Sequence, residues 1–287
     1  MDYRSIAHIL KSENIDMGGT QIRQALPTKK VERISPFLLL HHFGPFSVAP
    51  GGKAFEVAPH PHRGFEPVTF LYRGGLRHKD SRGNEGILAA GDVQWMTAGR
   101  GIIHSERASD TFRESGGIME GVQLWVNLPK DKKRVPPRYQ DIKADSIPEI
   151  IKEDGKVRIK VVAGSYAGQQ GPAQTHSPIL ALQLEVQSGV ATSVDIPEDD
   201  NSMLYLLRGQ LESVNGFVYE AGTLLHYKKD GASVMIKARE DAEILFLAGA
   251  PIDEPLAQWG PYVMNTQTEI LEAMRDYQMG KMGFYVD

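Results

Sequence analysis

The sequence of 287 residues contains no cysteine. This absence excludes disulfides, thiolate metal ligands and cysteine nucleophiles, so a protein-bound metal would have to be held by imidazole and carboxylate groups. No apolar run approaches the roughly 20 residues that are needed to span a bilayer. The opening residues also lack the apolar block of a signal peptide. We therefore expect a cytoplasmic protein that does not interact with a membrane.

An excess of positive charge is also missing. The chain carries 32 Lys and Arg against 36 Asp and Glu, for a formal net charge of -4, and its pI is about 6.2. A nucleic-acid-binding protein usually gathers basic side chains on one face. This composition therefore disfavours direct nucleic-acid binding and, for a regulatory protein, favours a protein partner.

The apolar segments are short, rich in β-forming residues and separated by turn residues. This pattern is typical of a β-sandwich or a barrel and not of alternating strands and helices. We predict a mainly β fold. The predicted strands include residues 67–72, 121–128, 157–163, 179–186, 202–207 and 242–248.

A weak internal repeat indicates two copies of one β-domain. Residues 71–76 (LYRGGL) resemble residues 206–211 (LLRGQL), and residues 90–93 (AGDV) resemble residues 221–224 (AGTL). The two matches occur in the same order and at nearly the same separation, which predicts tandem antiparallel jelly-roll barrels in residues 1–135 and 136–287. Residues 128–148 are expected to connect them, with the charged run Lys130 to Arg134 solvated.

One short helix is predicted near the C-terminus. Thr266 and Glu269 have the spacing of a capping box, and apolar residues follow at helical intervals from Ile270 to Tyr277. Gly280 is expected to end this helix. Its apolar face is expected to pack on a barrel.

Four potential metal ligands occur on two strand-like segments. Side chains two residues apart on a strand point to the same face, so His60 lies with His62, and His104 with Glu106. Glycine-containing turns at residues 73–75 and 99–101 would fold the second segment back beside the first. The pattern predicts one metal site in the N-terminal barrel.

Three imidazoles and one carboxylate suit a divalent transition metal such as Fe, Mn, Ni, Cu or Zn, and they suit Ca or Mg poorly. A metal that prefers six ligands would keep open positions for water, substrate or dioxygen, whereas zinc could close a tetrahedron with the same four groups. Glu106 has three possible roles: ligand, hydrogen-bonding partner of a ligand, or general base.

Other polar residues are weaker candidates. Glu66 would share the face of His62 only if the strand ran through Gly64 without a break, and His41, His42 and His78 are expected to be structural, with His42 the one that could reach the barrel mouth. The repeat offsets place no ligand set in the second copy. The positions that correspond to the ligands and to Glu66 are Asp195, Pro197, Asn201, Met235 and Lys237, while His176 and His226 are isolated. One metal per chain follows.

The segments HPHRGFEPVTFLYRGGLRHKD, GDVQWMTAGRGIIHSE and AGAPIDEPLAQWGPYVMNTQTEI resemble the pirin family of the cupin superfamily. The resemblance extends over nearly the whole chain. It implies a bicupin of two β-barrels, with a metal in the N-terminal barrel bound by His60, His62, His104 and Glu106. The wider cupin pattern would use a glutamate at the position of Glu66, whereas pirins take the carboxylate from the position of Glu106.

For function, the resemblance implies an Fe(II)-dependent quercetin 2,3-dioxygenase, which opens a flavonol ring with dioxygen and releases carbon monoxide. Glu106 is then the candidate base for the flavonol hydroxyl. Pirins also act as regulators through protein contacts, so a non-enzymatic metal-binding protein is the competing hypothesis. A different small-molecule reaction on the same scaffold remains a third.

Overall fold

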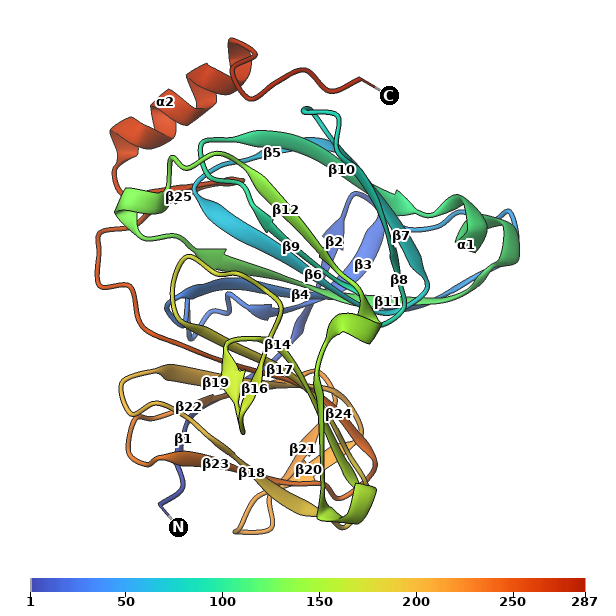
Figure 1. Ribbon diagram of the computed structural model, residues 1–287, viewed down its shortest axis with the longest axis vertical. Coiled ribbons are helices and arrows are strands. Elements are labelled where there is room, and N and C mark those ends of the chain that lie inside the picture. The colour runs from blue at the N-terminus through green and yellow to red at the C-terminus, as the bar shows by residue number, and fades with distance from the viewer. Residues whose placement is uncertain (1, 287) are drawn as a thin grey trace. The chain divides into compact units, whose positions relative to one another are not determined.

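The computed structural model describes residues 2–286 and is mainly β (Figure 1). Two compact units divide the chain. The N-barrel comprises Asn14–Ile22, Phe37–Ala144 and Ile252–Asp287, and the C-barrel comprises Met1–Glu13, Arg23–Pro36 and Asp145–Pro251. The units thus differ from the contiguous ranges 1–135 and 136–287. The first residues pair with a strand of the C-barrel, and the residues after 251 pack on the N-barrel.

Two sheets surround the predicted ligands. The larger sheet has seven strands, in the order β12 (Arg138–Ile142), β9 (Val93–Thr97), β6 (Phe65–Arg73), β11 (Gly117–Asn127), β4 (Phe37–Val48), β3 (Thr20–Leu26) and β2 (Glu13–Met17). The smaller has four, in the order β5 (Glu56–His62), β10 (Ile102–Ala108), β7 (Gly75–Asp80) and β8 (Glu85–Ala89). The paired strands are antiparallel, as is usual for sheets with one packed face.

The C-barrel has its own seven-stranded sheet, in the order β1 (Ile6–Lys11), β22 (Thr223–Tyr227), β19 (Asn201–Arg208), β24 (Ala242–Gly249), β17 (Ile179–Val186), β14 (Val157–Ala163) and β13 (Glu149–Lys152). Three two-stranded ribbons accompany it: β18 (Ala191–Asp195) with β23 (Ser233–Lys237), β20 (Gln210–Glu212) with β21 (Val218–Glu220), and β15 (Ser165–Tyr166) with β16 (Gln169–Gln170). A continuous apolar cluster that includes Leu182, Leu204 and Phe246 forms its core.

The sequence repeat corresponds to a repeated turn. Gly74 follows the end of β6 and Gly209 follows the end of β19, and both have a positive φ, 94° and 77°. In each copy the second motif hydrogen-bonds to the first: Gly91 N donates to Leu71 O at 2.7 Å, and Gly222 N donates to Leu206 O at 2.8 Å. The prediction of two related β-domains is confirmed by this equivalence.

Helices are few. α1 (Asp110–Ser115) is short, and three single 3-10 turns occur at Lys130–Lys132, Ala144–Ser146 and Glu153–Gly155. α2 (Gln267–Gln278) begins at the predicted capping box: Glu269 N donates to Thr266 Oγ1 at 3.2 Å, and Thr266 N donates to a Glu269 carboxylate oxygen at 3.0 Å. α2 packs on the hairpin of β25 (Ala257–Trp259) and β26 (Tyr262–Met264), and so belongs to the N-barrel and not to the second barrel. No helix within residues 2–286 is long and apolar enough to cross a membrane.

Candidate metal centre

Strand register brings the three predicted histidines together. His60 and His62 lie two residues apart on β5, and His104 on β10 is directly opposite His60 in the antiparallel pair. Directly opposed residues and alternate residues share one face of a sheet. Within residues 2–286 these three side chains form the one group of three or more potential ligands whose ligand atoms all lie within 4.8 Å of one another.

The distances between the imidazoles fit a single metal ion. His60 Nε2 lies 3.0 Å from His62 Nε2 and 3.1 Å from His104 Nε2. Two nitrogens that bind one ion at about 2.0–2.1 Å stand roughly 2.9–3.4 Å apart for bond angles between about 90° and 109°. The Nδ1 of His60 contacts the Ala58 carbonyl at 2.9 Å, so it carries the ring proton of the neutral imidazole and leaves Nε2 with a free lone pair.

Burial keeps the other two imidazoles neutral. His62 and His104 are 2% and 1% exposed. Burial, with a smaller contribution from neighbouring histidines, holds the pKa of each well below its ordinary value. Neutral imidazole is the form that binds metals. Three close nitrogens with available lone pairs therefore constitute a site that a cation would stabilise.

Glu106 lies on the same face of β10 as His104 but is held by two polar neighbours. Thr69 Oγ1 donates to its Oε1 at 3.2 Å, and Gln123 Nε2 donates to its Oε2 at 3.1 Å. Trp125 Nε1 in turn donates to Gln123 Oε1 at 3.3 Å. Burial raises the pKa of Glu106, opposed by His60 and by these two hydrogen bonds. Its role as a fourth ligand stays a prediction.

Sequence reasoning missed Thr69 and Gln123. Their signal is a polar residue in the middle of an otherwise apolar strand, in PVTFLY of β6 and in GVQLWV of β11. The two residues are directly opposed across these strands. Thr69 is buried and Gln123 is half-buried. Buried polar groups need a polar partner, and Glu106 provides it for both.

Aromatic side chains form one wall of the centre. The ring of His62 meets Phe65 edge-on at 5.0 Å between centroids and Trp125 at 5.4 Å. Phe65 and Trp125 lie 4.3 Å apart. These large rings restrict the orientation of the His62 imidazole and reduce the local polarity.

The strand of His60 and His62 is anchored by basic residues. Arg63 Nε donates to Arg100 O at 2.7 Å, and one of its terminal nitrogens pairs with Asp276 of α2 at 3.0 Å. Lys133 is 1% exposed, and its Nζ donates to three oxygens within 3.0 Å: Gly64 O, Asn127 Oδ1 and Val263 O. The prediction that the whole run Lys130 to Arg134 is solvated was therefore wrong, because Lys133 satisfies buried carbonyl groups.

The weaker candidates lie outside the group of histidines. Glu66 accepts a hydrogen bond from Thr97 Oγ1 at 2.6 Å. It lies three residues before Thr69 on β6 and therefore on the opposite face of that strand. His42 pairs with Glu120 at 3.0 Å. His41 instead shares the face of Gln123, its directly opposed residue.

His78 is directly opposite Glu106 on β7. It stacks on Tyr139 with a centroid distance of 4.9 Å, and it contacts Gln94. Gln94 Nε2 also donates to Asp141 Oδ1 at 3.0 Å. His78 thus belongs to a polar cluster beside the centre and not to the ligand group.

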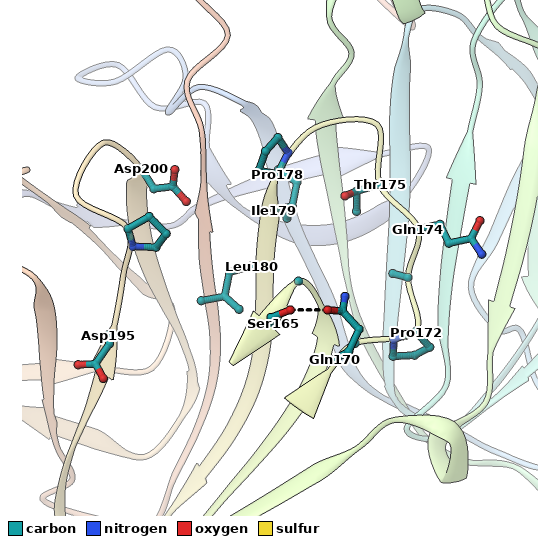
Figure 2. A pocket seen from close by; sticks show the side chains of 14 residues that line it. Ser165, Gln170, Pro172, Gln174, Thr175, Pro178, Ile179, Leu180, Asp195 and Asp200 are labelled. Atoms are coloured by element: carbon teal, nitrogen blue, oxygen red, sulfur yellow. Dashed lines mark hydrogen bonds between the residues drawn. The ribbon is translucent and has the colours of Figure 1, made fainter. Parts of the chain in front are cut away.

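The C-barrel contains a cavity of a different character. Figure 2 shows this space of about 580 Å³, lined by residues that include Gln170, Thr175, Asp195 and Asp200. Asp195 occupies the position that the repeat offset assigns to His60. No histidine is among the described lining residues, so this cavity does not repeat the ligand chemistry of the N-barrel.

Comparisons with known proteins identify the family. The Pirin model matches residues 19–126, and the Pirin C-terminal cupin domain matches residues 181–283. A Pseudomonas aeruginosa protein named "Putative quercetin 2,3-dioxygenase" is 42% identical over 250 residues, which are 87% of each chain.

Solved structures show the same fold. A structure of quercetin 2,3-dioxygenase from Acinetobacter baumannii is 37% identical, with a TM-score of 0.93 over 98% of this chain and 99% of that one. A bacterial pirin from Escherichia coli, solved in complex with nickel(II), shares the fold at 18% identity, with a TM-score of 0.65 over 85% of this chain and 99% of that one. The structure has two cupin-like sheet domains, with a histidine triad in the first of them. Together with the family matches over both halves of the sequence, this establishes that the chain is a bicupin of the pirin family.

Proposed function

We propose that this protein is a metal-dependent dioxygenase that opens flavonols such as quercetin with dioxygen and releases carbon monoxide. The observation that carries the proposal is the cluster of His60, His62 and His104, whose Nε2 atoms lie 3.0–3.1 Å apart along two contacts in a buried part of the N-barrel. The names of the Pseudomonas and Acinetobacter relatives support a flavonol as the substrate.

The proposed ligands are His60, His62, His104 and Glu106, and the proposed metal is Fe(II). Mn, Ni, Cu and Zn suit the same nitrogen and oxygen donors, and the Escherichia coli pirin was solved with nickel(II). A bound redox-active ion would supply Lewis acidity and one-electron chemistry between a flavonol and dioxygen.

Glu106 is the proposed general base. Its carboxylate lies on the same face of β10 as His104, where it can accept the 3-hydroxyl proton of a flavonol bound at the triad. Thr69 and Gln123 each hold one carboxylate oxygen and so fix its orientation. A positioned base of this kind contributes roughly 10²–10⁴-fold to a rate.

The surroundings of the triad suit a flat aromatic substrate. The buried rings of Phe65 and Trp125 pack next to His62, so the surroundings of this imidazole are apolar and aromatic. Burial of the site also limits the access of bulk water, which strengthens the electrostatic interactions inside it.

The test combines metal analysis with a quercetin assay on the same samples. The protein is reloaded anaerobically with iron, and loss of flavonol absorbance is followed after oxygen is added. We expect about one iron per chain at the triad, with loss of both metal and turnover in His104→Ala. Glu106→Gln should retain most of the metal and lose roughly 10²–10⁴-fold in turnover, whereas His176→Ala, at a histidine outside the triad, should behave as the unmodified chain.

The outcomes are distinct. Equal metal loss in His104→Ala and Glu106→Gln would contradict a separate role of Glu106 as a base. Stoichiometric metal without any turnover would overturn the dioxygenase proposal and favour a metal-dependent regulatory protein. Absence of metal affinity would overturn the proposed ligand set.

A further inference from the structure

A second pair of imidazoles lies in the C-barrel, far from the triad in sequence. His8 on β1 is directly opposite His226 on β22 in the antiparallel ladder, so the two side chains share one face of the sheet. Their Nδ1 atoms are 3.1 Å apart, and the rings are stacked with a centroid distance of 5.3 Å and an interplanar angle of 12°. Figure 1 shows β1 and β22 side by side.

The separation of the two nitrogens, taken alone, fits two ligands of one ion. At metal–nitrogen distances of about 2.0–2.1 Å, a separation of 3.1 Å corresponds to a nitrogen–metal–nitrogen angle of about 100°, between the cis angle of a square or octahedral site and the tetrahedral angle. Without an ion, the two Nδ1 atoms can share a single N–H···N hydrogen bond. The same contact therefore has two interpretations, which a metal titration separates.

Each imidazole presents its Nδ1 atom to the other. His8 is exposed and His226 is partly buried, so an ion at this pair would remain open to water on one side. Water molecules can complete its coordination.

The neighbouring strand adds an apolar side chain. Met203 of β19 is directly opposite His226 and is fully buried. Imidazole suits copper, nickel and zinc, whereas calcium and magnesium prefer oxygen ligands. The two imidazoles therefore indicate a transition ion over the oxygen-preferring cations.

We propose that His8 and His226 form a second metal-binding site, separate from the triad, that takes one borderline divalent transition ion and prefers Cu(II). Among first-row divalent ions, copper binds nitrogen ligands most tightly. The two ligands are 218 residues apart in the chain, so a bound ion would also cross-link the edge strand β1 to the strand beside it.

The experiment is a Cu(II) titration of the full-length protein whose triad has first been loaded with one equivalent of metal. We expect a further equivalent to bind, with nitrogen hyperfine structure in its electron paramagnetic resonance spectrum and a higher melting temperature of the C-barrel. His8→Ala and His226→Ala should each weaken this equivalent by at least about 10-fold, since loss of even a partner that only supports a ligand costs about 10–100-fold.

Controls separate this site from the triad. His104→Ala should lose the first equivalent and keep the second, and His176→Ala should keep both. His8→Gln preserves a hydrogen-bonding side chain of similar length, so it should fold normally and still lose the added equivalent. If the unmodified chain binds no further equivalent of Cu(II), the contact between His8 and His226 is only a hydrogen bond. If His8→Gln still binds the further equivalent, the copper site lies elsewhere. Either result would overturn the proposal.

Discussion

Gly64, two residues after His62, offers a sharp test of how the metal strand is held. Its φ is +86°, and a Cβ atom there would lie 1.9 Å from Val263 O and 2.9 Å from Met264 Sδ. Gly83 in the turn after β7 has nearly the same φ, +83°, but a Cβ atom there would have nothing within 4 Å. Gly64→Ala and Gly83→Ala thus both place an alanine at a positive φ, but only Gly64→Ala adds a steric overlap.

The magnitudes follow from these contacts. Both variants should lose about 1–2 kcal/mol because alanine is disfavoured in the left-handed region. Gly64→Ala adds about 1–3 kcal/mol for the overlap and about 1 kcal/mol for strain on the hydrogen bond from Gly64 N to Gly99 O, 2.8 Å long. We expect Gly64→Ala to be about 2–4 kcal/mol less stable than Gly83→Ala.

Tryptophan fluorescence can measure this difference selectively. All three tryptophans, Trp95, Trp125 and Trp259, lie in the N-barrel, so a denaturant titration followed by their emission reports the unfolding of that unit. Metal affinity measured on the same samples should fall about 10–100-fold in Gly64→Ala and remain unchanged in Gly83→Ala. Equal stability and equal metal affinity of the two variants would refute the argument.

Two further predictions concern the same unit. Burial raises the pKa of Glu66 to about 7 from an ordinary 4.5. The protonated carboxyl therefore stabilises the folded state fully below pH 4.5, and this stabilisation is lost as the pH rises through 7. The free energy of unfolding should change by about 3 kcal/mol over this range. Stability curves of Glu66→Gln and the unmodified chain should diverge by this amount between pH 4.5 and 8, and parallel curves would contradict the shift. Thr266→Ala should lower the free energy of unfolding by about 1 kcal/mol through loss of the helix cap. Glu272→Gln loses only an exposed ion pair and should change it by less than about 0.5 kcal/mol. Equal effects of the two variants would argue against the capping box.

Local patterns in the sequence predicted the features that depend on neighbours in the chain. The alternation of His60 and His62 predicted a shared face, and the spacing of Thr266 and Glu269 predicted the start of α2. These arguments need only the geometry of one strand or one helix turn. They succeeded because the flanking glycines and strands keep that local geometry intact.

Features that depend on distant pairing could not be predicted in this way. The charge of Lys133 indicated solvent, and nothing nearby in the sequence shows that three oxygen acceptors converge on it. The sequence shows no histidine near His226, because its neighbour His8 lies 218 residues away in the chain and meets it only through strand pairing. Strand order in a sheet determines such contacts, and register is set by tertiary packing.

The exchange of terminal segments between the units has a consequence for synthesis on the ribosome. Arg63 N donates to Pro261 O at 3.2 Å, and Val263 N donates to Arg63 O at 3.0 Å, so the backbone beside His62 is completed by residues translated after the C-barrel. Pro261 follows His104, the last of the three histidines, by 157 residues, which take on the order of 8–31 s to be translated at about 5–20 residues per second. The three triad histidines are therefore synthesised before the segment that anchors their strand. The final geometry of the centre can form only after residues 261–263 have been translated.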